Sequence, residues 1–106
     1  MKVVFTARAG ESIEKADTWW REHREKNPEL LAEEFIEATR VLGNAPHIGR
    51  RALNVGLEGV RFVTLQKTEK LLYYRVLEEE DVIELLVLWG ARKRSAPKLK
   101  NPRRRR

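Results

Sequence analysis

Residues 60–92 read VRFVTLQ, KTEK, LLYYRVL, EEED, VIELLVLW and GAR, and this stretch decides the fold. Its three apolar runs are rich in Val, Ile, Tyr, Phe and Trp, which favour β-strands. The charged breaks between the runs are too short for the crossover that a parallel return requires. The pattern therefore predicts a three-stranded antiparallel meander whose last strand leads directly into a basic segment, so we expect a site where that strand ends.

A short strand and a helix are predicted ahead of the meander. Residues 2–6 (KVVFT) suit a strand that must pair with the meander, because it is too short to stand alone. Apolar residues then recur at helical spacing over residues 7–25, and Gly10 or Ser12 marks a possible helix start. Acidic residues early in this segment and basic residues late in it match the helix dipole.

A second helix is predicted over residues 28–42, where the same apolar spacing returns. Asn27 suits the N-cap and Pro28 the first helical position. Gly43 and Asn44 supply a left-handed stop. Because the connection between the helices is so short, we expect an antiparallel helical hairpin, followed by a loop over residues 47–59.

The last strand carries apolar residues on both sides. Alternation predicts one side made of Ile83, Leu85, Val87 and Trp89, and another made of Val82, Glu84, Leu86 and Leu88. Two readings remain open: a central strand buried on both faces, or a second face that a partner covers.

The composition indicates one domain of 106 residues with an unevenly distributed charge. Nine of the 22 Lys and Arg residues lie in residues 91–106, which leaves residues 1–90 with 13 basic and 16 acidic side chains. The net charge of +6 therefore belongs to the C-terminal segment, which would attract phosphates or an acidic partner. Prolines and mutually repelling cations predict a flexible tail over residues 95–106.

Several function classes are disfavoured. Without cysteine, no disulfide framework or thiolate metal site is expected. His23 and His47 lack acidic partners at metal-ligand spacing, so we expect no metal and no cofactor. No apolar run reaches the length of a membrane span and no signal peptide is visible, so no membrane association and a cytoplasmic location are the expectation.

Four segments follow one another along the chain: ADTWWREHREKNPEL in the first helix, APHIGRR in the loop, EGVRFVTL with LLYYRVL in the meander, and LVLWGARKRSAPKL at the end. In this order they resemble the RelE/ParE superfamily of toxins from bacterial type II toxin–antitoxin, or plasmid stabilisation, systems. The resemblance covers residues 1–99. It implies an α+β fold of order β-α-α-β-β-β, with a helical hairpin packed on a mainly antiparallel sheet, a toxin domain over residues 1–94, and a cognate antitoxin in a hetero-oligomer.

The resemblance implies one of two targets. One is the ribosome together with its mRNA, and the other is DNA gyrase. RelE-like ribonucleases cut mRNA without metal and place an arginine where this chain has Leu71. Their second arginine matches Arg92, the one catalytic candidate, but their C-terminal Tyr has no counterpart and Gly90 stands where relatives have His. Glu58 is a nominal base with nothing to place it near Arg92. These absences favour a ParE-like toxin that acts by binding.

The residues that the resemblance and the charge pattern assign to target binding are Arg61, Arg75, Arg92, Lys93 and Arg94. The plainer alternative is that Arg61 and Arg75 pair with Glu78, Glu80 or Glu84 across strands, and that the last three are a solvated tail.

The candidates for partner contact are aromatic. Trp19 lies beside the apolar stripe of its helix and is the tryptophan expected to be exposed, whereas Trp20 and Trp89 are expected in the core. Tyr73 and Tyr74 are adjacent on a strand and must face opposite sides of the sheet. We expect one of them in the core and Tyr73 in contact with a partner.

The sequence thus predicts a ParE-like toxin that poisons an essential target, with DNA gyrase the first candidate. A RelE-like ribosome-dependent mRNA endoribonuclease and a diverged, non-toxic nucleic-acid-binding module are the alternatives. The four arginines of residues 103–106 fit either a nucleic-acid anchor or an extension without a role.

Overall fold

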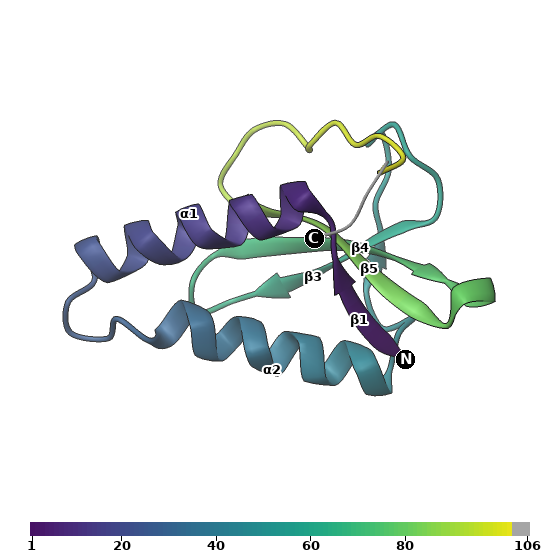
Figure 1. Ribbon diagram of the computed structural model, residues 1–106. Helices are drawn as coiled ribbons and strands as arrows, with labels where there is room; N and C mark the ends of the chain where they lie inside the picture. Colours follow the sequence, from purple (N-terminus) through teal and green to yellow (C-terminus); the bar gives the residue numbers. More distant parts are fainter. Residues whose placement is uncertain (103–106) are drawn as a thin grey trace.

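The computed structural model describes residues 1–102, and the arginine run at residues 103–106 lies outside this part. The elements follow the order β1 (Lys2–Phe5), α1 (Ala7–His23), α2 (Leu30–Asn44), β2 (Arg50–Arg51), β3 (Val60–Leu65), β4 (Lys70–Leu77), the 3-10 turn η1 (Glu78–Glu80) and β5 (Val82–Gly90) (Figure 1). This is the α+β order that the sequence predicts, with β2 as an additional short strand.

One mixed sheet forms the middle of the molecule, with strand order β1-β5-β4-β3-β2. The strands β3, β4 and β5 are the predicted antiparallel meander. β1 pairs with β5 in parallel, from Lys2 opposite Val82 to Phe5 opposite Leu85. The long chain segment between these two strands makes such a parallel return possible.

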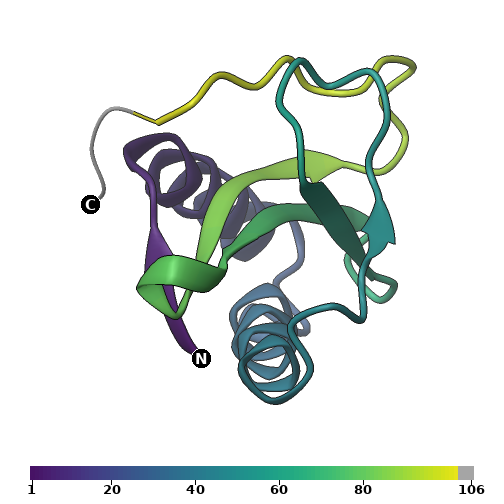
Figure 2. The ribbon, with the colours of Figure 1, turned by 90° about the vertical axis from the view of Figure 1, so that its right-hand side faces the viewer.

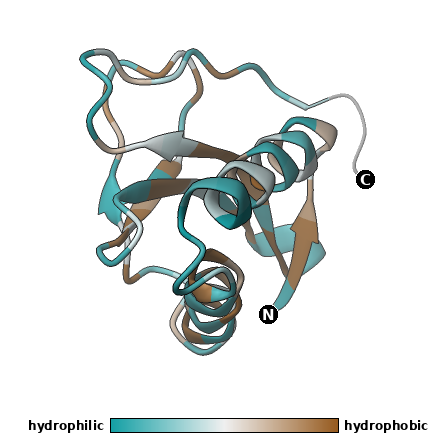
Figure 3. Ribbon diagram, turned by 90° about the vertical axis from the view of Figure 1, so that its left-hand side faces the viewer, coloured by the Kyte–Doolittle hydropathy of each residue, from teal (hydrophilic) through white to brown (hydrophobic). Residues whose placement is uncertain are grey.

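The two helices lie on one side of the sheet and enclose the main core with it (Figure 2). Buried members of this core include Leu31 and Phe35 from α2 and Leu72, Tyr74 and Leu85 from the meander. In Figure 3 the strands are largely hydrophobic and the connection between the helices is hydrophilic. No helix within residues 1–102 is long and apolar enough to cross a membrane.

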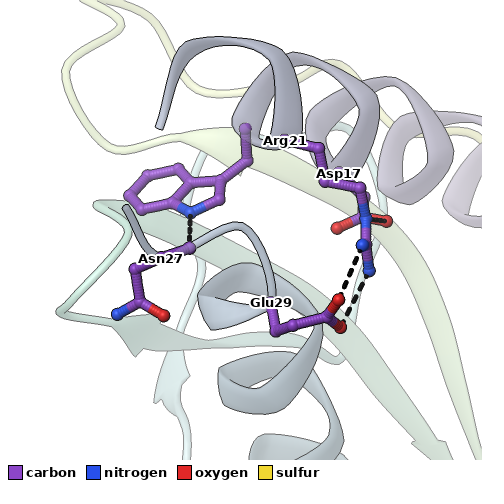
Figure 4. Close-up of polar contacts among 5 residues, drawn as sticks. Asp17, Arg21, Asn27 and Glu29 are labelled. Carbon is purple, nitrogen blue, oxygen red and sulfur yellow. Dashed lines mark hydrogen bonds and ion pairs between the residues drawn. The ribbon is translucent and has the colours of Figure 1, made fainter. Parts of the chain in front are cut away.

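Polar contacts fasten the helical hairpin at its tip (Figure 4). The indole N–H of Trp20 donates to the backbone oxygen of Asn27 at 2.9 Å. The Arg21 guanidinium reaches Asp17 at 2.9 Å and holds both oxygens of Glu29, at 2.9 and 3.1 Å. These bonds join the end of α1 to the chain that enters α2. The helices form the predicted hairpin, but residues 24–29 connect them, which is a longer connection than the sequence predicted.

The helix boundaries differ from the predicted ones. α1 begins earlier than Gly10, because the Thr6 hydroxyl accepts a hydrogen bond from Ala9 N–H at 3.1 Å and caps the helix. α2 begins at Leu30, and its cap residue Glu29 makes no side-chain capping bond. The left-handed stop expected at Gly43 is wrong, since within residues 1–102 the glycines with positive φ are Gly56 and Gly59.

A β-bulge corrects the expected alternation along β5. The register shifts between Tyr73 and Tyr74, which pair with Val87 and Leu85, so Leu86 is an additional residue on β5. Beyond it the sides exchange. Leu88 joins the main core with Ile83 and Leu85, while Val87 and Trp89 pack with Leu86 in a second cluster on the opposite face.

The chain's own C-terminal segment covers this second face of the sheet (Figure 2). We call residues 95–102 the strap. Leu99 is 5% exposed within the second cluster, and its N–H donates to the Val55 oxygen at 2.7 Å. The packing of Leu99 departs from the flexible tail expected after Arg94, because one leucine in a charged segment finds an apolar pocket. A boundary between a domain of residues 1–94 and a tail remains a prediction.

Candidate functional site

The chain leaves the sheet at Gly90 and makes a tight turn into three consecutive cations, Arg92, Lys93 and Arg94. The turn is closed by Lys93 N–H donating to the Gly90 oxygen at 3.2 Å. All three cations are exposed. The end of β5 therefore presents positive charge at the edge of the fold, as the sequence predicts.

Local contacts orient two of these cations without burying them. Arg92 Nη2 lies 2.8 Å from Glu69 Oε1, and the Arg92 side chain is 84% exposed. Lys93 Nζ lies 4.0 Å from the centroid of the Trp89 ring. An exposed ion pair of this kind contributes little to stability, so Arg92 can exchange Glu69 for another anion at small cost.

Arg75 faces the strap and supports the fold. Its Nε lies 2.7 Å from Glu84 Oε1, and its Nη2 donates to Asn101 Oδ1 at 2.8 Å. The Arg75 side chain is 15% exposed, and that of Glu84 is 2% exposed. The pairing of Arg75 with Glu84 across strands is the plainer alternative that the sequence left open.

Arg61 lies on the helix-facing side of the sheet, opposite Tyr74. Its Nη1 donates to the Gly49 oxygen at 2.8 Å and so fastens the loop ahead of β2. The Tyr74 hydroxyl donates to the Pro46 oxygen and accepts from Gly49 N–H, at 2.8 and 2.9 Å. Arg61 and Tyr74 together hold this loop against the sheet.

The sequence assigned Arg61, Arg75 and Arg92 to target binding together, but the structure does not place them on one surface. Arg61 and Arg75 point to opposite faces of the sheet. Arg75 lies opposite Glu84, six residues before Gly90 on β5, which places it about 20 Å from the strand end that carries Arg92. The structure thus gathers only Arg92, Lys93 and Arg94, which are adjacent in sequence.

The two aromatic candidates differ in exposure. Trp19 is 45% exposed, as expected, and its ring stacks on His23. Tyr73 is 4% exposed, and its ring lies 5.5 Å from that of Phe62 under the strap. Burial raises the pKa of both Tyr73 and Tyr74. The expectation that one of these tyrosines is free to contact a partner is wrong, because the strap covers the second face.

Comparison with known proteins decides the family. Residues 3–94 match the model of the ParE toxin of type II toxin–antitoxin systems, parDE. The chain belongs to this family of toxins. Because the match spans most of the sequence, it includes the meander, the helical hairpin and the cations at the end of β5. No curated protein matches the chain.

Two solved structures resemble the toxin. They are the isolated Escherichia coli RelE toxin, at 22% identity over 89% of this chain and 86% of that chain, and the intact E. coli RelBE toxin–antitoxin complex, at 21% identity over 87% and 98%. The TM-score is 0.53 for each. At such identity the likeness concerns the fold, which is the RelE-like arrangement of two helices on a mixed sheet.

The positions that match the ribonuclease pattern carry few reactive side chains in this chain. Leu71 lies opposite Trp89 in the second cluster, where it packs as an apolar residue. Glu58 lines a hollow beside Arg61, which is distinct from the hollow that Arg92 lines. Within residues 1–102 no group of three or more His, Asp or Glu side chains is placed to hold a metal ion.

The structure adds two cations that the sequence analysis missed. Arg24, at the end of α1, and Lys70, at the start of β4, line the same hollow as Arg92 and Lys93. The position of Lys70 could be inferred from the sequence, because Lys70 begins β4 and the short break between β4 and β5 brings the end of β5 back beside it, where Lys70 pairs with Gly90. Arg24 could not have been placed, since its position depends on how α1 crosses the sheet.

Proposed function

We propose that this chain is a toxin that acts by binding and poisoning an essential target, with DNA gyrase the first candidate. A cognate antitoxin neutralises it. The observation that carries the proposal is the match to the ParE toxin model over residues 3–94. In this proposal residues 1–94 form the toxin domain, and the basic residues after them add electrostatic attraction.

Binding without cleavage agrees with the residues at the strand ends. Metal-independent RNA cleavage needs a base, an acid and cations that stabilise the charge on the phosphate. Leu71 is packed in the second cluster and Gly90 has no side chain, so Arg92 is the one remaining group of the ribonuclease pattern. A single exposed guanidinium can bind an anion but supplies no general base.

The separation of charge along the β4–β5 hairpin supports the proposal that the target binds at the end of β5. The turn at residues 78–81 carries four consecutive carboxylates, and the opposite end of β5 leads to Arg92, Lys93 and Arg94. Such a polarity orients the toxin as it approaches a negatively charged target. We therefore assign target binding to the end of β5, and Arg61 and Arg75 to support of the fold.

The antitoxin is expected to act on the same end of the molecule. An acidic helix or strand laid over Arg92, Lys93 and Arg94 would cover the positive charge and exclude the target. The intact RelBE complex of E. coli, whose toxin has a similar fold, is a toxin–antitoxin assembly. A hetero-oligomer with an antitoxin encoded beside this toxin is therefore the expected resting form.

One alternative keeps a specific observation in its favour. Arg92 is exposed at the end of the last strand, and the fold resembles that of RelE. If the chain is a ribosome-dependent endoribonuclease, transcripts mapped after its induction will carry new 5′ ends at codons in the A site. Intact messages are the result that we expect. A non-toxic nucleic-acid-binding module would cause no growth arrest on expression.

Supercoiling by purified gyrase tests the proposal. We expect the full chain in molar excess to inhibit supercoiling, and the variant R92A/K93A/R94A to inhibit at least about tenfold less, because three charge contacts to the target are lost. R50A is the matched control, since Arg50 is an exposed cation on the short edge strand β2. Normal supercoiling at high excess of the unchanged toxin rules out gyrase as the target.

A further inference from the structure

A hollow of about 330 Å³ opens where α1 ends beside the turn between β3 and β4. Its lining includes Trp19 near the end of α1 and Arg24 just after it, Glu69 in the turn before β4 and Lys70 at the start of β4, and Arg92 and Lys93 beyond β5. The helix, the hairpin and the chain after the sheet thus meet at one place. The hollow therefore combines two cations that follow β5 with residues from distant parts of the sequence.

The charge in the hollow is positive and largely uncompensated. Four cations line it, and Glu69 is the one carboxylate among the described lining residues. Glu69 pairs with Arg92, at 2.8 Å. Within residues 1–102, Arg24, Lys70 and Lys93 form no ion pair with a carboxylate. Three positive charges therefore remain for an anionic ligand.

Aromatic rings accompany these cations. The ring of Trp19 stacks on that of His23, with centroids 4.4 Å apart and planes within 8° of parallel. The Arg24 guanidinium lies 5.1 Å from the Trp19 ring and 5.6 Å from that of Trp20. Trp19 remains 45% exposed, so part of its side chain is accessible to solvent beside Arg24 in the lining of the hollow.

We propose that this hollow binds single-stranded nucleic acid. Its phosphates would contact Arg24, Lys70 and Lys93, and a base would extend the stack of Trp19 and His23. A cationic groove with exposed aromatic rings is the combination that binds single strands without sequence preference. A carboxylate-bearing peptide would satisfy the cations but would not use the flat rings. A duplex would not use them either, because its bases are already stacked.

This activity goes beyond the binding of gyrase proposed above and does not require it. Single-strand binding is measured with the purified full chain and a fluorescently labelled oligothymidylate, in the absence of gyrase, ribosomes or antitoxin. The residues after Pro102 are common to all variants, so their charge cancels in each comparison. The unchanged toxin can therefore fail the gyrase assay and still bind the single strand, or the reverse.

Salt titrations separate the contribution of the cations, which contact phosphates, from that of Trp19, on which a base stacks. For a single strand the slope of log K against log salt is about −0.7 for each phosphate contact. We expect R24A and K70A each to make the slope shallower by about 0.7. We expect W19L to weaken binding by about fivefold or more with an unchanged slope, because a stacking contact is lost without a charge. W19F should recover part of that loss.

R50A is the control for general loss of positive charge, because Arg50 lies on β2, away from the hollow. It should match the unchanged chain in affinity to within about twofold. Three outcomes overturn the proposal. In the first, R24A, K70A and R50A weaken binding equally. In the second, W19L binds like the unchanged chain. In the third, a duplex or polyglutamate binds as tightly as the single strand and is equally sensitive to W19L.

Discussion

Arg75 Nε lies 2.7 Å from Glu84 Oε1, and this ion pair is enclosed between the sheet and the strap. At 15% and 2% side-chain exposure, the charges of Arg75 and Glu84 compensate each other in the interior. The pair therefore explains why Arg75 is not part of the proposed target-binding surface at the end of β5. Its guanidinium neutralises a carboxylate that β5 carries into the interior, and it also holds Asn101 of the strap.

The first prediction concerns this pair. Arg75→Ala should lower the free energy of unfolding by about 3 kcal/mol or more, because the buried Glu84 carboxylate loses its ion pair with Arg75. The double variant R75M/E84L should lie much closer to the unchanged chain, since it removes both charges and keeps the volume. Urea denaturation monitored by tryptophan fluorescence measures both. A loss below about 1 kcal/mol for R75A would show that Glu84 is solvated.

The second prediction tests the strap. Leu99 is 5% exposed and makes a backbone hydrogen bond to Val55. Leu99→Ala should lower the free energy of unfolding by about 2 kcal/mol, because the second cluster loses a buried side chain. Lys100→Ala is the control, since Lys100 is exposed beside it and should change little. Equal thermal unfolding of both variants and the unchanged chain would mean that the strap does not pack.

The third prediction is a loss of stability at alkaline pH. Burial raises the pKa of Tyr73 and Tyr74 above the value of about 10 that an unfolded chain shows. The fold thus favours the neutral phenols, and their contribution to stability is present below pH 10 or so and is lost as the pH rises through the raised pKa. The variant Y73F should show a smaller alkaline loss in pH-dependent denaturation.

Tyr73 is the better position for this test. The Tyr74 hydroxyl bonds to Pro46 and Gly49, so Y74F would also remove hydrogen bonds at neutral pH. If the alkaline loss of Y73F equals that of the unchanged chain, Tyr73 is accessible to solvent and the strap does not cover it.

The fourth prediction separates packing from surface charge at the tip of the helical hairpin. Trp20 is 9% exposed and bonds to Asn27, so Trp20→Ala should cost about 3 kcal/mol. Arg21→Ala should leave the melting temperature almost unchanged, because the ion pairs of Arg21 with Asp17 and Glu29 are exposed. A large effect of R21A would mean that these pairs act as a cooperative network.

Much of the fold could be predicted from local patterns. The apolar runs and their short breaks predicted the meander, and two apolar stripes at helical spacing predicted the hairpin. The bulge at Leu86 was hidden, because β5 is apolar on both sides and a change of side leaves no mark in its sequence. The packing of Leu99 was hidden by the charged residues and prolines around it, although a lone leucine in such a segment is itself a signal.

The candidate site was predictable only where its residues are adjacent in sequence. Arg92, Lys93 and Arg94 follow a strand, and their exposure follows from that position. Arg61 and Arg75 looked equivalent to them, because the register that pairs Arg75 with Glu84 is a tertiary property. Arg24 came close to Arg92 only through the packing of α1 on the sheet, which no local pattern encodes.

Growth after induced expression tests the central claim most directly. In a bacterial host, the unchanged chain should stop growth, and co-expression of the small reading frame beside its gene should restore it. R92A/K93A/R94A, at equal soluble abundance, should allow growth, and R50A should stop it. Continued growth with abundant, folded, unchanged protein would contradict the assignment as a toxin, and arrest by the triple variant would contradict the assignment of target binding to the end of β5.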